Sequence, residues 1–161
     1  MINFFNKHQN EELIGEYGNL FNKLFIHTKN ILNIDYDLEL SVTFISNEES
    51  VTINKKYRNK NNVGDVISFP IEMDDFIYEQ TGYREIGDLF IAYDEAINKA
   101  KLYNHDLDVE MSWLFVHGFL HLLGYDHELG DEEEQEMFQL TDLILSKINI
   151  KYNIINVIGE K

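Results

Sequence analysis

The sequence predicts an α+β fold: one domain with a small, mostly four-stranded mixed sheet, helices packed on it, and a central buried helix that carries two histidines. A length of 161 residues is typical of a single domain and is enough to bury a core. A hydrophobic content of 44%, with 13% aromatic residues, is typical of folded chains. Segments of period-two alternation are interspersed with segments of helical periodicity, which favours a mixed class.

Composition limits the chemistry. There is no cysteine, so disulfides and thiolate ligands are excluded, and any metal must be held by His, Asp or Glu. The net charge of −16 argues against broad, sequence-independent nucleic-acid binding, but it is compatible with a local basic patch or a bound metal. Because no apolar run is long enough to span a bilayer and no signal-like start is present, we expect a soluble, cytoplasmic protein without a membrane partner.

The first third of the chain predicts a helix, a strand and a second helix. Apolar residues recur at helical spacing over residues 10–32. Residues 38–45 alternate between apolar and polar, as expected for a half-buried strand. Ser46 or Asn47 then suits the N-cap of a helix that ends near Arg58.

The middle of the chain predicts two more strands and a helix. Residues 66–69 form a short strand that Pro70 ends. Residues 73–85 are expected to form an exposed loop, and residues 87–92 a buried strand. Residues 93–103 have helical spacing.

The last third predicts two helices. One begins at Asp106 or Asp108 and is apolar nearly all round, which indicates a central buried helix. Asp131 has Glu134 three residues later, the spacing of a capping box, so we expect it to be the N-cap of a final helix. The segment after Ile150 suits either a terminal strand or a frayed end.

Three histidines define the candidate site. His117, His121 and His127 follow the order H-x3-H-x5-H. The first two project from one face of a helix, and Gly124 suits a positive-φ turn that brings the third back toward them. Burying imidazoles on an apolar helix is costly unless they are paired or bound. Three imidazoles leave a fourth position open for water, as in catalytic zinc sites. The alternative interpretation is histidines packed in the core.

The same spacing occurs in metzincin proteases, but one residue argues against a protease. The glutamate that acts as general base in H-E-x-x-H is replaced by Gly118. A base for peptide hydrolysis would therefore have to come from elsewhere in the chain.

Three blocks of sequence resemble one known family. Residues 117–127 are similar to the signature of the YbeY-type endoribonucleases, metal-dependent enzymes of rRNA maturation. Residues 54–58 with 65–70, and residues 86–91, resemble that family's second and third blocks, in the same order. Gly64 departs from the family, which more often has threonine there, and this changes the loop beside Arg58.

The resemblance implies a site and a function. It implies one zinc ion on His117, His121 and His127 plus water, and a functional arginine at Arg58. A guanidinium suits the charge that develops on a phosphodiester, and zinc polarises a phosphate or lowers the pKa of a water. The resemblance also implies a single endoribonuclease domain over residues 1–161, selective for single-stranded RNA, that acts on rRNA precursors at the small-subunit 3′ end and in ribosome quality control. Ribosomal proteins or assembly factors are implied partners.

Other residues have two interpretations each. Lys55, Lys56 and Lys60 suit either an RNA-backbone strip or a solvated helix C-terminus, and Asp126 suits either a ligand-orienting carboxylate or a turn. We expect surface positions for His8, His27 and His105, packing roles for Trp113 and Tyr125, and cap or turn roles for Asp65 and Asp88.

Two other functions remain open from the sequence. One is a metallohydrolase of another class, such as a peptidase. The other is a metal-stabilised, non-enzymatic binding module in ribosome assembly, which the charge of −16 favours because ribosomal proteins are basic. Three imidazoles also suit nickel, copper or iron.

Overall fold

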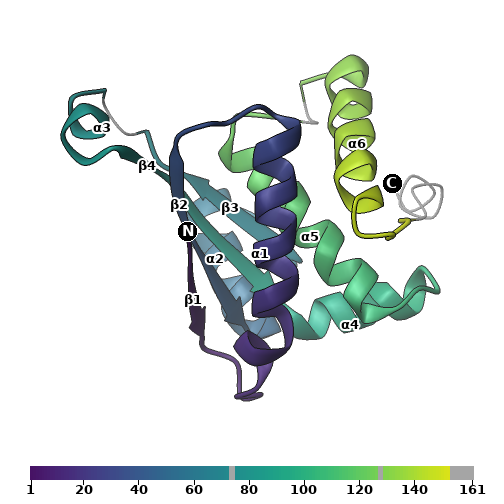
Figure 1. The fold of residues 1–161 in the computed structure, drawn as a ribbon. Helices are drawn as coiled ribbons and strands as arrows, with labels where there is room; N and C mark the ends of the chain where they lie inside the picture. Colours follow the sequence, from purple (N-terminus) through teal and green to yellow (C-terminus); the bar gives the residue numbers. More distant parts are fainter. Residues whose placement is uncertain (73–74, 127–128, 153–161) are drawn as a thin grey trace.

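A four-stranded mixed sheet forms the middle layer of the protein, and the computed structural model describes residues 1–72, 75–126 and 129–152 (Figure 1). The strand order is β1-β2-β4-β3. The strands are β1 (Ile2–Asn6), β2 (Asp37–Ile45), β3 (Val66–Pro70) and β4 (Tyr83–Ala92). β2 pairs in parallel with β1 and β4, whereas β3 is antiparallel to β4 and forms one edge.

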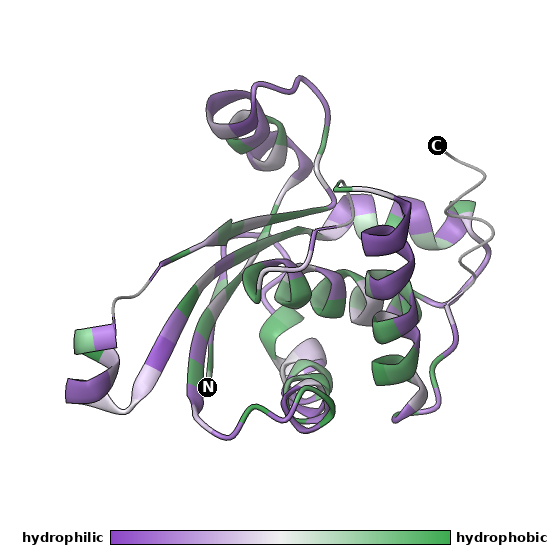
Figure 2. Cartoon of the chain, turned by 90° about the horizontal axis from the view of Figure 1, so that it is seen from above, coloured by the Kyte–Doolittle hydropathy of each residue, from purple (hydrophilic) through white to green (hydrophobic). Residues whose placement is uncertain are grey.

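Helices cover both faces of the sheet. The helices are α1 (Leu13–Ile31), α2 (Asn47–Arg58), α3 (Asp75–Thr81), α4 (Tyr93–Leu102), α5 (Leu107–Leu122) and α6 (Asp131–Ser146). α1 and α5 lie on one face with α6 outside them, α2 lies on the other face, and α3 projects away from the sheet (Figures 1 and 2). No helix in the described segments combines the length and hydropathy that crossing a membrane requires. This architecture confirms the predicted α+β fold.

α5 is the central helix, as its sequence predicts. Twelve of its sixteen residues are buried, and in Figure 2 it is coloured mostly hydrophobic. Aromatic rings join it to α1: Phe21 stacks on Phe115 with centroids 4.6 Å apart, and Phe25 stacks on Phe119 at 5.4 Å. Such pairs add to the stabilisation from burial itself. The histidine helix is therefore held rigidly in the core.

The sequence analysis missed one element, and two of its local expectations are wrong. β1 is not evident from the sequence, because it is short and finds its partner, β2, more than thirty residues away. The expected loop over residues 73–85 contains α3, and β4 already begins at Tyr83. Asp131 is the first residue of α6 rather than its N-cap, which is Gly130.

The predicted cap of α2 is confirmed. The Ser46 side chain accepts a hydrogen bond from the Glu49 backbone N–H at 3.1 Å. At the other end, Asn59 adopts a left-handed conformation with φ of 54°, a common way to end a helix. Both ends of α2 are thus fixed locally, which sets the position of Arg58.

Two glycines allow α5 to approach the sheet closely. A Cβ on Gly118 would lie 2.8 Å from Leu89 Cδ2 and 3.0 Å from Val66 Cγ2. A Cβ on Gly87 would lie 2.2 Å from the Phe69 carbonyl oxygen, and Gly87 also has φ of 142°, a region that favours glycine. The helix and the two strands therefore meet where side chains are missing.

We predict that Gly87→Ala lowers the free energy of unfolding by at least about 3 kcal/mol, because it combines backbone strain with a clash against a carbonyl. In a domain of this size the melting temperature should fall by about 6 °C or more. Thermal unfolding checks this. Gly15→Ala is the matched control: nothing lies within 4 Å of a Cβ at this helical position, so a gain of roughly 0.5–1 kcal/mol is expected. Equal stability of the two variants would contradict the close approach at Gly87.

Candidate functional site

The last turns of α5 bring two of the predicted ligands together. His117 is buried, with 7% of its surface exposed, and His121 is half-buried. Their Nε2 atoms are 3.2 Å apart, and the two rings are nearly perpendicular at 81°. The four-residue spacing therefore places both imidazoles on one helix face with the same nitrogen pointing to one place.

This spacing fits two ligands of one tetrahedral zinc ion. Zinc lies about 2.0–2.1 Å from imidazole nitrogens, so two tetrahedral ligand atoms are roughly 3.3 Å apart. The observed Nε2 separation of 3.2 Å agrees with that value. Without a cation, two neutral imidazoles at this distance share one hydrogen bond, in which one ring donates and the other accepts. The donor pair thus fits the ion that the sequence implies.

The third predicted ligand, His127, lies outside the described residues. Within residues 1–72, 75–126 and 129–152, no group of three or more His, Asp or Glu side chains gathers at metal-binding distances. The turn that precedes it is as predicted: Gly124 has φ of 104° and its N–H donates to the His121 carbonyl at 3.0 Å. The complete three-histidine set and the role of Asp126 beside it stay predictions.

Packing explains why position 118 is a glycine. The position that holds the general base in H-E-x-x-H faces β3 and β4 here, where a Cβ would already be 2.8 Å from Leu89 Cδ2. A glutamate side chain cannot fit there without displacing the helix. The absence of the protease base therefore follows from the contact between α5 and the sheet.

The last turns of α2 and α5 meet the sheet at the same end of β3. Arg58 ends α2 with its side chain exposed. Its neighbour Tyr57 packs edge-to-face on Phe69 of β3, with centroids 5.4 Å apart. On the other face of the sheet, Leu122 of α5 packs beside Gly87, which also contacts the Phe69 carbonyl. The helix ends that carry the predicted arginine and the histidine pair thus converge on one strand end.

The basic residues of α2 form one exposed segment. Lys55, Lys56 and Arg58 occupy its last turn, Lys60 follows, and all four are exposed. Cations are favoured at a helix C-terminus because the helix dipole is negative there. The structure agrees with the solvated-terminus interpretation, and RNA contact by the lysines stays a prediction.

The two aspartates link secondary structure elements. Asp65 accepts a hydrogen bond from the Val66 N–H at 2.8 Å, and its other oxygen lies 3.6 Å from Lys99 Nζ. Asp65 lies in a bend just before β3 and caps no helix, so of the two expected roles the structure supports the turn role. The cap or turn role expected for Asp88 is wrong, because Asp88 lies within β4. It accepts a hydrogen bond from the Ser41 hydroxyl at 2.5 Å, which ties β4 to β2.

The surface position expected for His8 is wrong. His8 is buried, its Nε2 lies 3.1 Å from Asp94 Oδ1, and its Nδ1 accepts from the Asn10 N–H at 2.9 Å. His27 is partly exposed, whereas the His105 side chain is only 11% exposed. His8 fixes the connection between β1 and α1, and a short polar loop gives no sequence signal for such a contact.

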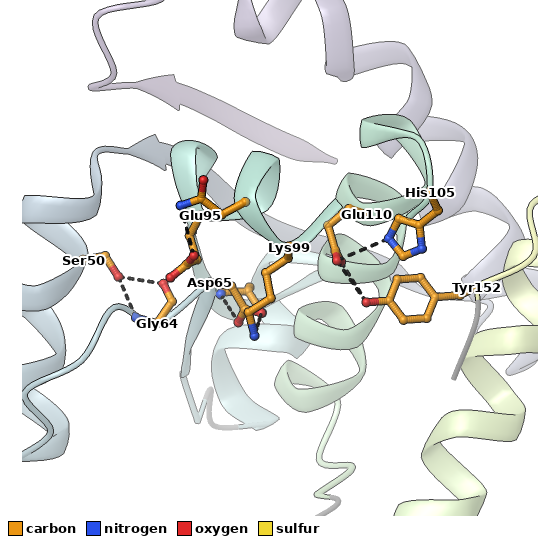
Figure 3. Close-up of polar contacts among 10 residues, drawn as sticks. Ser50, Gly64, Asp65, Glu95, Lys99, His105, Glu110 and Tyr152 are labelled. Atoms are coloured by element: carbon orange, nitrogen blue, oxygen red, sulfur yellow. Dashed lines mark hydrogen bonds and ion pairs between the residues drawn. The ribbon is translucent and has the colours of Figure 1, made fainter. Parts of the chain in front are cut away.

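A buried polar cluster at the start of α5 is not evident from the sequence. Glu110 is 1% exposed, and the Tyr152 hydroxyl lies 3.0 and 2.9 Å from its two oxygens (Figure 3). His105 Nε2 is 3.4 Å from the same carboxyl group. Burial raises the pKa of Glu110 to about 7, although the Tyr152 hydrogen bond works in the opposite direction. Burial lowers the pKa of His105, so this histidine is neutral beside it at neutral pH.

Trp113 has the packing role that its position predicts. Its indole is 8% exposed and stacks on the His117 ring, with centroids 4.4 Å apart and planes 14° from parallel. Tyr125 is partly buried against the hydrophobic core. The buried indole therefore contacts a candidate metal ligand directly.

Comparisons with known proteins point to one family. A family model described as Endoribonuclease YbeY matches residues 3–149. A protein of Mycoplasma mycoides subsp. mycoides named Endoribonuclease YbeY is 46% identical over 153 residues, which cover 95% of this chain and 92% of the relative. The protein of the same name from Oenococcus oeni is 42% identical over 135 residues, 84% of this chain and 88% of the relative. A Thermotoga maritima protein solved in solution has a TM-score of 0.58 at 24% identity over 91% of both chains, which shows the fold.

We predict that Glu110 makes stability depend on pH. Its pKa is 4.5 in the unfolded chain and about 7 in the folded one, so the folded state holds the proton more tightly. The free energy of unfolding should therefore fall as pH rises from 4.5 to about 7, by roughly 3 kcal/mol. Urea unfolding of the wild type and of Glu110→Gln isolates this contribution, because other groups titrate in both proteins. Parallel stability curves across this range would contradict the raised pKa.

Proposed function

Because the chain belongs to the YbeY endoribonuclease family, we propose that it cleaves single-stranded rRNA precursors at the small-subunit 3′ end with a zinc ion held by His117, His121 and His127. The observation that carries the proposal is the pair of Nε2 atoms 3.2 Å apart on the buried central helix. Family membership supplies the RNA substrate class. Ribosome quality control is the proposed wider role of the same activity.

Arg58 is the proposed phosphate-binding residue. Its guanidinium is exposed at the end of α2, beside the strand end that α5 also contacts. A guanidinium can donate two parallel hydrogen bonds to the non-bridging oxygens of one phosphate. It stabilises the transition state because negative charge accumulates on those oxygens. In this role Arg58 binds and orients the phosphodiester.

The two described histidines hold the cation through their Nε2 atoms. When bound, zinc supplies Lewis-acid polarisation of the phosphate or lowers the pKa of a water. Burial shields His117 from competing water, and the perpendicular rings keep both nitrogens directed to one point. The two histidines thus bind the cation and fix its position. A local cation also favours the approach of RNA, because the chain has a net charge of −16.

The acidic surface is compatible with ribosomal partners. Basic ribosomal proteins or assembly factors would be attracted by the net charge of −16. The proposed substrate puts the reaction in the cytoplasm. A peptidase activity is disfavoured because Gly118 packs on the sheet and offers no carboxylate.

We predict that Arg58→Ala reduces cleavage of single-stranded RNA by at least about 100-fold, because one positioned donor to a developing charge contributes on that scale. The variant should keep the wild-type zinc content, since Arg58 is not a ligand. His121→Ala should lose both activity and metal. Cleavage assays with single-stranded RNA, structured RNA and a peptide mixture, together with elemental analysis, check this.

Lys23→Ala is the matched control, because it removes an exposed cation from α1. Its activity and zinc content should equal those of the wild type. Cleavage that persists in metal-free His121→Ala would identify a contaminating nuclease. Protein purified without chelators that contains no transition metal would rule out the zinc proposal, and peptide cleavage without RNA cleavage would favour the protease alternative.

A further inference from the structure

One face of α5 carries a row of two aromatic or acidic side chains followed by two histidines. Glu110, Trp113, His117 and His121 follow one another at spacings of three, four and four residues. Residues at these spacings lie on the same helix face, one turn above the next. The buried carboxyl group at the start of the helix is therefore in line with the histidine pair at its end.

Ring stacking connects the two ends of this row. The Trp113 indole stacks on the His117 imidazole, with centroids 4.4 Å apart, and also on the Tyr152 ring at 4.9 Å and 21°. The Tyr152 hydroxyl donates to the Glu110 carboxyl group, which holds this tyrosine in place (Figure 3). Tyr152 is itself 4% exposed. A residue beyond α6 is thus linked through one indole to a candidate metal ligand.

A ring contact of this kind fixes the orientation of the His117 imidazole. The second side-chain torsion of histidine has a broad energy profile, so the helix backbone alone does not fix the ring plane. Groups that orient a ligand imidazole raise metal affinity. Stacking on Trp113 restricts the plane of His117 and keeps its Nε2 directed toward that of His121.

Packing, rather than hydrogen bonding, fixes the indole. Within the described part of the chain, the Trp113 indole N–H has no hydrogen-bond acceptor. Its ring neighbours there are His117, Tyr152 and, at a longer centroid distance of 6.4 Å, Phe138. Removing the Tyr152 ring would leave the indole free to tilt, and the imidazole would tilt with it.

We propose that Tyr152 is a positioning residue for the metal ligand His117 and acts through the Trp113 ring. The Glu110 carboxyl group anchors the tyrosine. This inference rests on the proposed function, because it takes His117 to be a ligand. It extends the site from the end of α5 to the segment that follows α6.

The test compares Tyr152→Leu and Tyr152→Phe with the wild type as full-length proteins. Zinc affinity is measured by competition with a chelator of known affinity. Tyr152→Leu removes the ring and should weaken zinc binding about 3- to 10-fold, the range that corresponds to loss of one aromatic stack. Tyr152→Phe keeps the ring and loses only the anchor, so a smaller loss is expected.

Tyr17→Leu is the matched control for general destabilisation. Tyr17 is also 4% exposed, and its ring neighbours are Phe21, Phe44 and Tyr93, away from the indole. Its melting temperature should fall as that of Tyr152→Leu does, while its zinc affinity stays at the wild-type value. Equal weakening of zinc binding in both variants would show a merely structural role and overturn the inference.

A second measurement needs no metal. In the metal-free protein, the Trp113 indole shifts the NMR resonances of the carbon-bound His117 ring protons through its ring current. These shifts should move toward unstructured values in Tyr152→Leu and stay unchanged in Tyr17→Leu. Wild-type shifts together with wild-type zinc affinity in Tyr152→Leu would overturn the inference and leave the proposed function intact. A wild-type protein that binds no zinc would overturn the proposed metal site, and the inference with it.

Discussion

The close approach of α5 to β3 and β4 is the constraint on which the site depends. Gly118 and Gly87 permit it, because a Cβ at either position would meet a neighbour at less than 3 Å. The approach holds the histidine helix against the edge strand and brings its last turn to the strand end that α2 also contacts. It also excludes a carboxylate from position 118. One packing contact therefore positions the candidate ligands and leaves no room at position 118 for the carboxylate that a zinc peptidase would use.

Burying a polar side chain on the central apolar helix costs free energy unless the side chain has a partner. The partners of the polar groups on α5 therefore show how that cost is offset. His117 and His121 face one another through their Nε2 atoms, and Glu110 meets a tyrosine hydroxyl. A buried carboxyl group loses less free energy when it is protonated, which is why burial raises the pKa of Glu110. At both ends of α5, a buried polar side chain is thus paired with another polar side chain.

Local signals predicted much of this protein, and long-range contacts account for what they missed. The period of α5, the Ser46 cap and the turn at Gly124 depend on neighbouring residues, so the sequence alone predicts them. β1 depends on a partner more than thirty residues away. The bond between Glu110 and Tyr152 joins residues 42 positions apart. Histidine spacing predicted that His117 and His121 lie on one helix face, but it could not predict that the Trp113 ring stacks on His117.

The net charge of the chain bears on the selectivity proposed for the site. A protein with net charge −16 repels a polyanion over most of its surface, so RNA can bind only where cations offset that repulsion. Arg58 and the exposed lysines of α2 are concentrated at one helix end, beside the strand end that α5 reaches. A zinc ion on the histidine pair would add positive charge at the end of α5, which reaches the same strand end from the other face of the sheet. A single-stranded segment can bend into so small a region, whereas a rigid duplex would bring many more phosphates against the acidic surface. The proposed preference for single strands is therefore consistent with electrostatics as well as with shape.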